Sequence, residues 1–468
     1  MVTRGGQGVE SEASATAAPG RRRGGPGAVR PRRSPSPARP GLRAAALLLP
    51  LLPALLGSGC ASIARLPPPP PSETVALPVL GVAEARFWAD GDPAPIAAYL
   101  ARVRSRQGGE TAKPLAGPLA GPSAAPPLSG PPTLRPAHYL ALSGGADNGA
   151  FGAGVLVGWT EAGTRPRFDV VTGVSAGALI APFAFLGPAY DDRLAAVFTE
   201  VAPGDVFRLG GVAFALLFGE ALADTSPLAR LIERHADARL MADVAAEHAR
   251  GRLLLVGTTN IDLGRPVVWN LGALAASGRP EALELVRRVL LASASVPGAF
   301  PPVLIDVEGP DGRRYQEMHV DGGAATQVFL YPPGLDPREG WRRVGTEGRE
   351  RTAWVVRNGR VDVTGAERPP SGLFTVAARS AQTLLHYAGV ADIQRIHLTA
   401  LRDGIAFRLQ SIGPDFAAPH AGFFDPAYMR ALFAYGRARG RDARSWATAP
   451  PPVGVIVQPP PPPPAPGG

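Results

Sequence analysis

The sequence Phe168-Asp-Val-Val-Thr-Gly-Val-Ser-Ala-Gly177 reads as a buried strand that runs into Gly-x-Ser-x-Gly, and apolar residues continue it as a helix. Gly173, Ser175 and Gly177 hold the fixed positions. A serine on such a sharp strand-to-helix turn takes a strained backbone and tolerates only glycine where the chain packs back on itself. The turn lifts the hydroxyl above the sheet and points the helix N-terminus at a developing oxyanion. We therefore expect Ser175 to be a nucleophile.

A glycine-rich loop lies upstream, in Leu140-Ala-Leu-Ser-Gly-Gly-Ala-Asp-Asn-Gly149. Small residues between a strand and a helix start present backbone N–H groups outward, which makes an anion site. A nucleotide-binding loop is the rival interpretation, but the run does not fit Gly-x-Gly-x-x-Gly, and the only lysine of the chain is Lys113. We expect an oxyanion hole at Gly144, Gly145 and Ala146. The donors would be the amides of this loop, chiefly those of Gly145 and Ala146, with Gly144 allowing close approach.

Two further motifs follow, Ala292-Ser-Ala-Ser-Val-Pro-Gly-Ala-Phe-Pro-Pro302 and Val320-Asp-Gly-Gly323. With the loop and the turn, in this order and spacing, they make the chain resemble the patatin-like phospholipases, a family of serine acyl hydrolases. The resemblance covers roughly residues 136–415. It implies a Ser175–Asp321 dyad without histidine, in which Asp321 is the general base. It also implies a phospholipid or another acyl-ester lipid as substrate, and no metal or organic cofactor.

The loop departs from the usual pattern of the family at two positions. Ala146 stands at the third glycine, and Asn148 stands where arginine or lysine is common, so a cation is lost. Asp147 adds a negative charge beside the expected oxyanion hole, unless it caps the following helix. The remaining motif positions are kept, and they are Gly149, Gly322 and Gly323.

A Ser-His-Asp triad is the alternative catalytic arrangement. His386, His397 and His420 follow Asp321, so the order serine, acid, histidine is allowed. His386 lies in a helical pattern and is expected to be a solvated or packing residue. His397 lies in an alternating, strand-like run, Arg395-Ile-His-Leu-Thr. His319 could share a strand face with Asp321 and tune it.

Two other functions remain open at this stage. One is a carboxylesterase that acts on esters other than phospholipids. The other is a catalytically weak lipid-binding protein of the membrane surface, which the missing cation at Asn148 motivates.

The N-terminal region has the features of an export signal. Residues 1–43 are rich in arginine, and the apolar run 44–56 is short and broken by proline, which suits a signal peptide better than a membrane span. Cys60 is the only cysteine, and it falls where a bacterial lipoprotein signal carries its lipid-modified residue. We expect an exported lipoprotein, anchored to a membrane through Cys60. Because Ala61 follows, the outer membrane is expected in a Gram-negative host.

Charge and cysteine content argue against several other classes. Residues 1–59 hold 9 arginines and 2 glutamates, so they contribute +7 of the formal net charge of +9. The rest of the chain is nearly neutral, and nucleic-acid binding has no support. A single cysteine permits no internal disulfide, and no Cys/His cluster has zinc spacing. The oligomeric state cannot be inferred.

The predicted domain organisation has five parts. They are a signal peptide (1–59), a proline-rich membrane-proximal linker (60–135), the catalytic domain (136–415), a C-terminal helical extension (416–448) and a disordered proline-rich tail (449–468). A short amphipathic helix could form at 95–106, within a region that we interpret as a spacer. The apolar run 206–222 could be a lid, an acyl-chain wall or an ordinary core helix.

Strands and helices alternate through the catalytic domain. This alternation predicts an α/β fold with three layers, α/β/α, around a mostly parallel sheet. The expected strands are 138–142, 168–172, 253–258, 267–270, 319–321 and 353–358, and the expected helices are 152–162, 178–186, 227–235, 240–250, 281–292 and 372–387.

Overall fold

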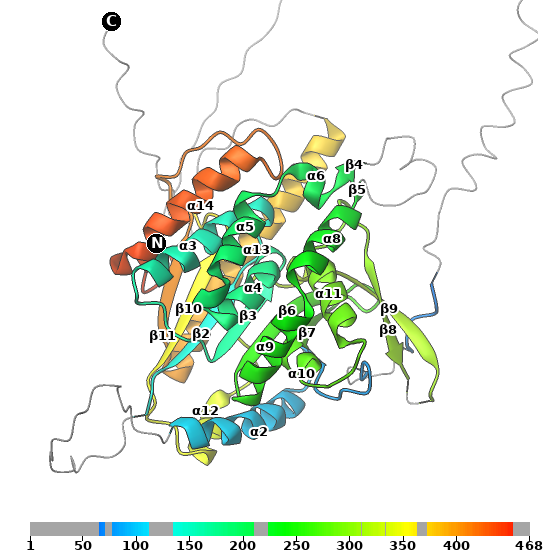
Figure 1. Ribbon diagram of the computed structural model, residues 1–468, viewed down its shortest axis with the longest axis vertical. Helices are drawn as coiled ribbons and strands as arrows, with labels where there is room; N and C mark the ends of the chain where they lie inside the picture. The colour runs from blue at the N-terminus through cyan, green and yellow to red at the C-terminus, as the bar shows by residue number, and fades with distance from the viewer. Residues whose placement is uncertain are drawn as a thin grey trace, which may run out of the picture. The chain divides into compact units, whose positions relative to one another are not determined.

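The computed structural model describes residues 65–70, 77–111, 134–209, 223–309, 311–332, 334–362 and 372–452. The predicted signal peptide, Cys60 and almost all of the predicted tail lie outside these residues. Within them, a nine-stranded sheet forms the centre of the fold (Figure 1). Its main path runs through β1 (Arg86–Trp88), β7 (Arg265–Asn270), β6 (Leu253–Asn260), β3 (Val170–Val174), β2 (Ala137–Leu142), β10 (Arg351–Arg357) and β11 (Ala406–Ser411).

The neighbours from β6 to β11 along this path are all parallel, and β7 and β1 are added antiparallel. Two more strands, β8 (Val303–Glu308) and β9 (Arg314–Asp321), form an antiparallel pair, and the end of β9 pairs with the end of β6. The predicted α/β class and the mostly parallel sheet are confirmed.

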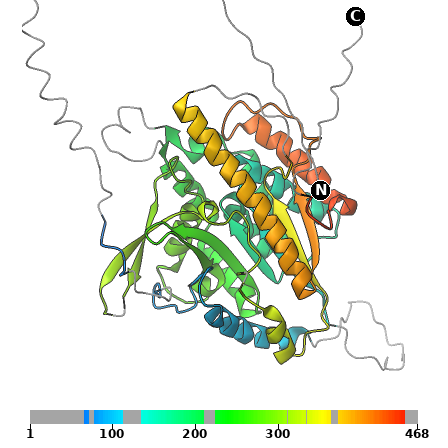
Figure 2. The ribbon, with the colours of Figure 1, turned by 180° about the vertical axis from the view of Figure 1, so that it is seen from behind.

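Helices cover both faces of the sheet. One face carries α3 (Gly149–Glu161), α4 (Ala176–Leu186), α5 (Asp191–Thr199) and α9 (Ala238–Ala249), and α14 (Pro426–Arg441) packs beside α3 (Figure 1). The opposite face carries α13 (Leu373–Asp403) (Figure 2). The remaining elements are α2 (Ala94–Thr111), α6 (Pro203–Val206), β4 (Arg208–Leu209), β5 (Ala223–Asp224), α8 (Ser226–His235), α10 (Leu271–Ala275), α11 (Ala282–Ser293) and α12 (Pro337–Arg343).

The two cores follow from the alternation of side chains along a strand. In β2, Leu140 and Leu142 enter the core beneath α3 and α4, whereas Ala141 faces Ile393 and Ile396 of α13. All three strand residues are fully buried. Such an apolar run, without polar alternation, is expected of a strand covered on both faces.

The C-terminal half of α13 differs from the sequence prediction. Residues 395–399, including His397, alternate like a strand but are helical. The spacing of Ile393, Ile396 and Ala400 explains the helix, because these residues form one stripe that packs on the sheet. A five-residue alternation is too short to decide between the two periods.

Residues 77–111, which the sequence led us to place in a spacer, pack on the catalytic domain. β1 pairs with β7 and extends the sheet. Arg86, only 2% exposed, forms a bidentate ion pair with Glu317 of β9, with 2.9 Å between Nη2 and Oε1. A buried charge left without its partner is strongly destabilising, so this pair holds the segment against the sheet.

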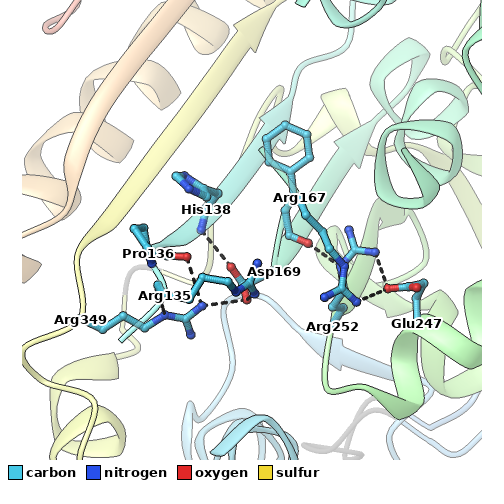
Figure 3. A network of polar contacts seen from close by, with 9 residues as sticks. Arg135, Pro136, His138, Arg167, Asp169, Glu247, Arg252 and Arg349 are labelled. Atoms are coloured by element: carbon cyan, nitrogen blue, oxygen red, sulfur yellow. Dashed lines mark hydrogen bonds and ion pairs between the residues drawn. The ribbon is translucent and has the colours of Figure 1, made fainter. Parts of the chain in front are cut away.

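A polar network fixes the amino-terminal ends of the central strands (Figure 3). Asp169 precedes β3 and accepts hydrogen bonds from Arg135, Arg349 and the His138 amide, at 3.0, 3.1 and 3.0 Å. Nearby, Arg252 Nη1 donates to Glu247 over 2.7 Å. Arg135, Asp169, Arg252 and Arg349 each precede one of the parallel strands, whereas Ser175 follows the carboxyl end of β3. The network therefore lies at the opposite edge of the sheet from Ser175, and we assign it a structural role.

The contact between α3 and α14 is made by backbone. Gly154 and Gly158 of α3 face Gly436 and Gly440 of α14. A Cβ added at Gly158 would lie 2.0 Å from the carbonyl oxygen of Arg437, closer than any real contact.

No helix in the described part of the chain combines the length and apolar character needed to cross a bilayer.

Replacing Gly158 by alanine should therefore force α14 away from α3. We expect a loss of about 1–3 kcal/mol in the free energy of unfolding, the usual cost of overpacking. Gly204→Ala is the matched control, because a Cβ at Gly204 meets no atom within 4 Å. Urea unfolding of both variants checks this, and equal stabilities would contradict the close contact.

Candidate active site

Ser175 occupies the turn between β3 and α4, with φ 55° and ψ −124°. A non-glycine residue in this region of φ is strained by about 1–3 kcal/mol. The two flanking positions must be glycine because a side chain at either would collide with backbone. A Cβ at Gly173 would lie 2.4 Å from the carbonyl oxygen of Gly177, and one at Gly177 would lie 2.3 Å from the carbonyl oxygen of Leu142. The turn predicted from Gly-x-Ser-x-Gly is therefore present.

Ser293, at the end of α11, holds this turn in place. Its hydroxyl accepts a hydrogen bond from the Ser175 amide at 3.0 Å and donates one to the Gly257 carbonyl of β6 at 2.7 Å. Ser293 is fully buried. It lies in the Ala-Ser-x-x-x-Pro motif that the sequence singled out, but its role could not be inferred there, because the contact joins segments far apart in the chain.

Asp321 is the last residue of β9 and is 5% exposed. Its Oδ1 accepts the Gly323 amide at 2.6 Å, and its own amide donates to the Ser295 carbonyl at 2.8 Å. Burial raises the pKa of Asp321 to about 6, while hydrogen bonds from the Ser175 side chain and the Gly323 amide lower it. The two expected catalytic side chains are thus brought together, and the carboxylate is a proton acceptor near neutral pH.

The glycine loop lies directly beside Ser175. A Cβ at Gly144 would approach the Ser175 Cβ to 3.1 Å, and one at Gly145 would lie 2.0 Å from the Asn358 carbonyl oxygen. Ala146 has φ 50°, the left-handed region that the glycine usual at this position adopts without strain. Gly149 is also constrained, since its Cβ would lie 2.5 Å from the Phe198 ring.

The expected oxyanion donors need one correction. The Gly144 amide donates to the Gln327 carbonyl at 3.0 Å, so it is not available to a substrate. Within the described ranges, no group accepts a hydrogen bond from the Gly145 or Ala146 amide. These two amides remain as the candidate donors, and Gly144 keeps the role of allowing close approach.

The two atypical residues of the loop contact the C-terminal region. Asp147 is 3% exposed and does not cap a helix; its Oδ2 accepts His420 Nε2 at 2.8 Å and the Phe424 amide at 3.0 Å. Asn148 accepts the Tyr428 hydroxyl at 2.7 Å. Asp147 thus ties the oxyanion loop to the segment that leads into α14, and Asn148 ties it to α14 itself.

Gln327 links the loop to the base. Its carbonyl accepts the Gly144 amide, and its side-chain Nε2 donates to the Gly323 carbonyl at 3.0 Å. Arg357, at the end of β10, reaches Gln327 Oε1 at 3.4 Å. Burial lowers the pKa of Arg357 to about 10 against the attraction of Asp392, and its Nε has no hydrogen-bond partner. No sequence motif marks Gln327 or Arg357.

The candidate triad histidines take other contacts. His420 bonds Asp147, and the rings of His386 and His397 contact Tyr387 and Phe407. His319 is fully buried between the Thr258 hydroxyl and Glu317, at 3.0 Å from each. Burial lowers the pKa of His319 against the attraction of Glu317. The geometry brings Ser175 together with a carboxylate and with none of these four imidazoles.

An apolar cavity of about 330 Å³ opens beside Ser175. Its wall includes Val206, Phe207, Leu228, Phe300 and Phe424. Val206 and Phe207 begin the apolar run that the sequence offered as a lid or acyl-chain wall; residues 210–222 of that run lie outside the described residues. Among the described residues, no group of three or more His, Cys, Asp or Glu side chains could hold a metal ion.

A serine on a strained turn between a parallel strand and a helix is the arrangement that the nucleophile takes in serine hydrolases of the α/β class. Residues 140–331 match the patatin-like phospholipase family and form a patatin-like phospholipase domain. Such a domain implies lipid acyl hydrolase activity. Among solved structures, the crystal structure of VipD from Legionella pneumophila is similar, with 11% identity, coverage of 66% of this chain and 67% of VipD, and a TM-score of 0.33. Comparison with curated proteins found no match.

The raised pKa of Asp321 predicts a pH-dependent stability. The Asp321 carboxyl group binds its proton more tightly in the folded protein than in the unfolded chain. The free energy of unfolding should therefore fall as the pH rises from about 4 to about 6 and then level off. Two pKa units correspond to about 3 kcal/mol. Asp321→Asn should lack this pH dependence, so its stability relative to wild type should rise between pH 4 and pH 6 and stay constant above pH 6.

Urea unfolding at several pH values measures the effect. Subtracting the wild-type curve from that of Asp321→Asn removes the contribution of the other carboxyl groups. Parallel curves between pH 4 and pH 6 would contradict a buried, raised Asp321.

Proposed function

We propose that the protein is a lipid acyl hydrolase that uses Ser175 as nucleophile and Asp321 as general base. The observation that carries this proposal is the placement of Ser175, on its strained turn, beside the buried carboxyl group of Asp321, whose pKa burial raises to about 6. Such a group is mostly ionised at neutral pH and is still basic enough to accept a proton.

The reaction follows from these positions. As Ser175 Oγ attacks the ester carbonyl carbon, its proton passes to Asp321, and the carbonyl oxygen becomes an oxyanion. The Gly145 and Ala146 amides donate to that oxyanion, and the N-terminus of α4 adds a favourable partial charge. Collapse of the intermediate expels the alcohol, which takes the proton from Asp321. Water, activated by Asp321, then releases the acid from the acyl-enzyme.

The substrate class is supported by the cavity. Because its lining is almost wholly apolar, it suits the acyl chain of a phospholipid or of another lipid ester. A carboxylesterase acting on other esters is the second candidate, since the apolar cavity would bind the acyl chain and does not select the alcohol part of the ester. Hydrolysis of phospholipid vesicles and of a short-chain ester, measured side by side, distinguishes the two. Vesicle binding without hydrolysis would favour the lipid-binding alternative.

Ser175→Ala should lower hydrolysis of a soluble ester by several powers of ten, because no other group can form the acyl-enzyme. Asp321→Asn should lose acylation and deacylation together, since the base is removed from both steps. Circular dichroism of each variant checks that the fold is intact.

The histidines provide the controls for this test. His319, His386, His397 and His420 should each tolerate replacement by glutamine without a comparable loss. An inactive glutamine variant of one of them, together with an active Asp321→Asn, would establish a triad in place of the dyad.

We further propose that Cys60 carries a lipid anchor and that the exported protein is held on a membrane. The support is the sequence alone: an arginine-rich start, a short apolar run, and the only cysteine directly after Gly57-Ser-Gly. One acyl chain holds a protein only marginally, so stable anchoring requires the several chains of a lipoprotein.

Cys60→Ser should remove the attachment point, and no other cysteine can replace it. The variant should leave the membrane fraction or remain uncleaved, as fractionation and the mass of the mature chain would show. Wild-type protein that keeps residues 1–59 in the cytoplasm would refute the anchor and leave the hydrolase proposal intact.

A further inference from the structure

Helix α13 is much longer than the strands that it joins. It has 31 residues, about 46 Å at 1.5 Å per residue, whereas β10 has 7 residues and spans about 23 Å. Its C-terminal half packs on the sheet. Gly389 marks the end of that contact, because a Cβ there would lie 2.6 Å from Cζ of Arg357, the last residue of β10. Residues 373–388, the projecting half of α13, therefore extend past the sheet.

The projecting half lies at the edge of the sheet that carries Ser175. β10 and β11 are parallel and are joined by α13, so the helix must begin at the carboxyl end of β10. β3 is parallel to them and delivers Ser175 at its own carboxyl end. In both views the N-terminal end of α13 stands at the same end of the molecule as α6, β4 and β5 (Figures 1 and 2).

This projecting half exposes apolar side chains. Leu384, Tyr387 and Val376 are 72%, 53% and 49% exposed. At about 100° per residue these three positions fall within roughly 80° of one another, so they share one face of the helix. Arg379 is the only charged residue between 373 and 391, so the projecting half contains no acidic residue.

A second exposed apolar group stands at the mouth of the Ser175 cavity. Phe423 is 60% exposed and belongs to the lining of that cavity. It is positioned by its neighbours His420 and Phe424, both of which hydrogen-bond the buried Asp147 beside the oxyanion loop. Apolar side chains from two separate elements are thus exposed at the same edge of the sheet.

We propose that the projecting half of α13, together with Phe423, docks the enzyme on the surface of the lipid bilayer from which it takes its substrate. The inference rests on the proposed lipid hydrolase function. A helix with an apolar face binds the headgroup–acyl boundary through the area that it buries. Arg379 suits anionic headgroups, and the projecting half itself carries no carboxylate that such a surface would repel. Docking there brings the edge of the sheet that carries Ser175 to the lipids.

The test compares two double variants of the same helix. Leu384→Glu with Tyr387→Glu places two charges on the proposed docking face. Leu398→Glu with Leu401→Glu is the matched control, because those leucines are 65% and 63% exposed on the same side of the helix but lie beside the sheet, away from the edge that carries Ser175. Each is made in the chain that begins at residue 60 and carries Cys60→Ser, so that neither the apolar run 44–56 nor a lipid anchor can mask the effect.

Vesicles of phosphatidylcholine and phosphatidylglycerol serve as the membrane, and a soluble short-chain ester reports on the chemistry. Losing the burial of two large apolar side chains should weaken vesicle binding and vesicle hydrolysis by about tenfold or more. Hydrolysis of the soluble ester should stay within about twofold of wild type, and the control variant should match wild type in all three assays.

Each contrary outcome has a definite meaning. Equal vesicle binding by the two double variants would overturn the docking surface. A dimer that Leu384→Glu with Tyr387→Glu dissociates, with vesicle binding unchanged, would assign the face to a second copy of the chain. Vesicle binding that depends on this face, in a protein inactive on the soluble ester and on vesicles, would refute the hydrolase and leave the docking surface standing.

Discussion

The close approach of three backbone segments around Ser175 is the constraint on which the site depends. The carbonyl oxygens of Leu142 and Gly177 lie where side chains at Gly177 and Gly173 would have to be. β2, β3 and α4 therefore meet without side chains between them, and the positive φ of Ser175 is held by that contact and by Ser293. Because the oxyanion loop continues directly from β2, this contact also places the loop beside the nucleophile.

Gln327 couples the other two parts of the site. It joins the oxyanion loop through the Gly144 amide and the turn after Asp321 through the Gly323 carbonyl. The amide of Gln327 donates in turn to Asp392 of α13, at 2.7 Å. The helix that carries the proposed docking face is thus bonded to the residue that holds the loop and the base together.

The parts of the site that the sequence predicts are those with a local signature. Ser175 and the loop at 144–149 follow from glycine spacing beside apolar strands, and the position of Asp321 came from the family resemblance. Gln327 and Ser293 could not be found in this way, because their roles arise from contacts between distant segments. The strand-like run around His397 is helical for a related reason. Ile393, Ile396 and Ala400 form an apolar stripe that packs on the sheet, and this contact is not visible in the local alternation.

The changes at Asp147 and Asn148 bear on where the catalytic unit ends. A carboxylate next to an oxyanion hole would oppose the charge that forms there, but Asp147 is turned into hydrogen bonds with His420 and the Phe424 amide. Asn148 is held by Tyr428 on α14. The atypical loop is therefore matched by partners that lie beyond residue 415. Since α14 also meets α3 backbone to backbone, the region drawn from the sequence as a C-terminal extension completes the active-site wall, and the chemistry of the loop cannot be separated from it.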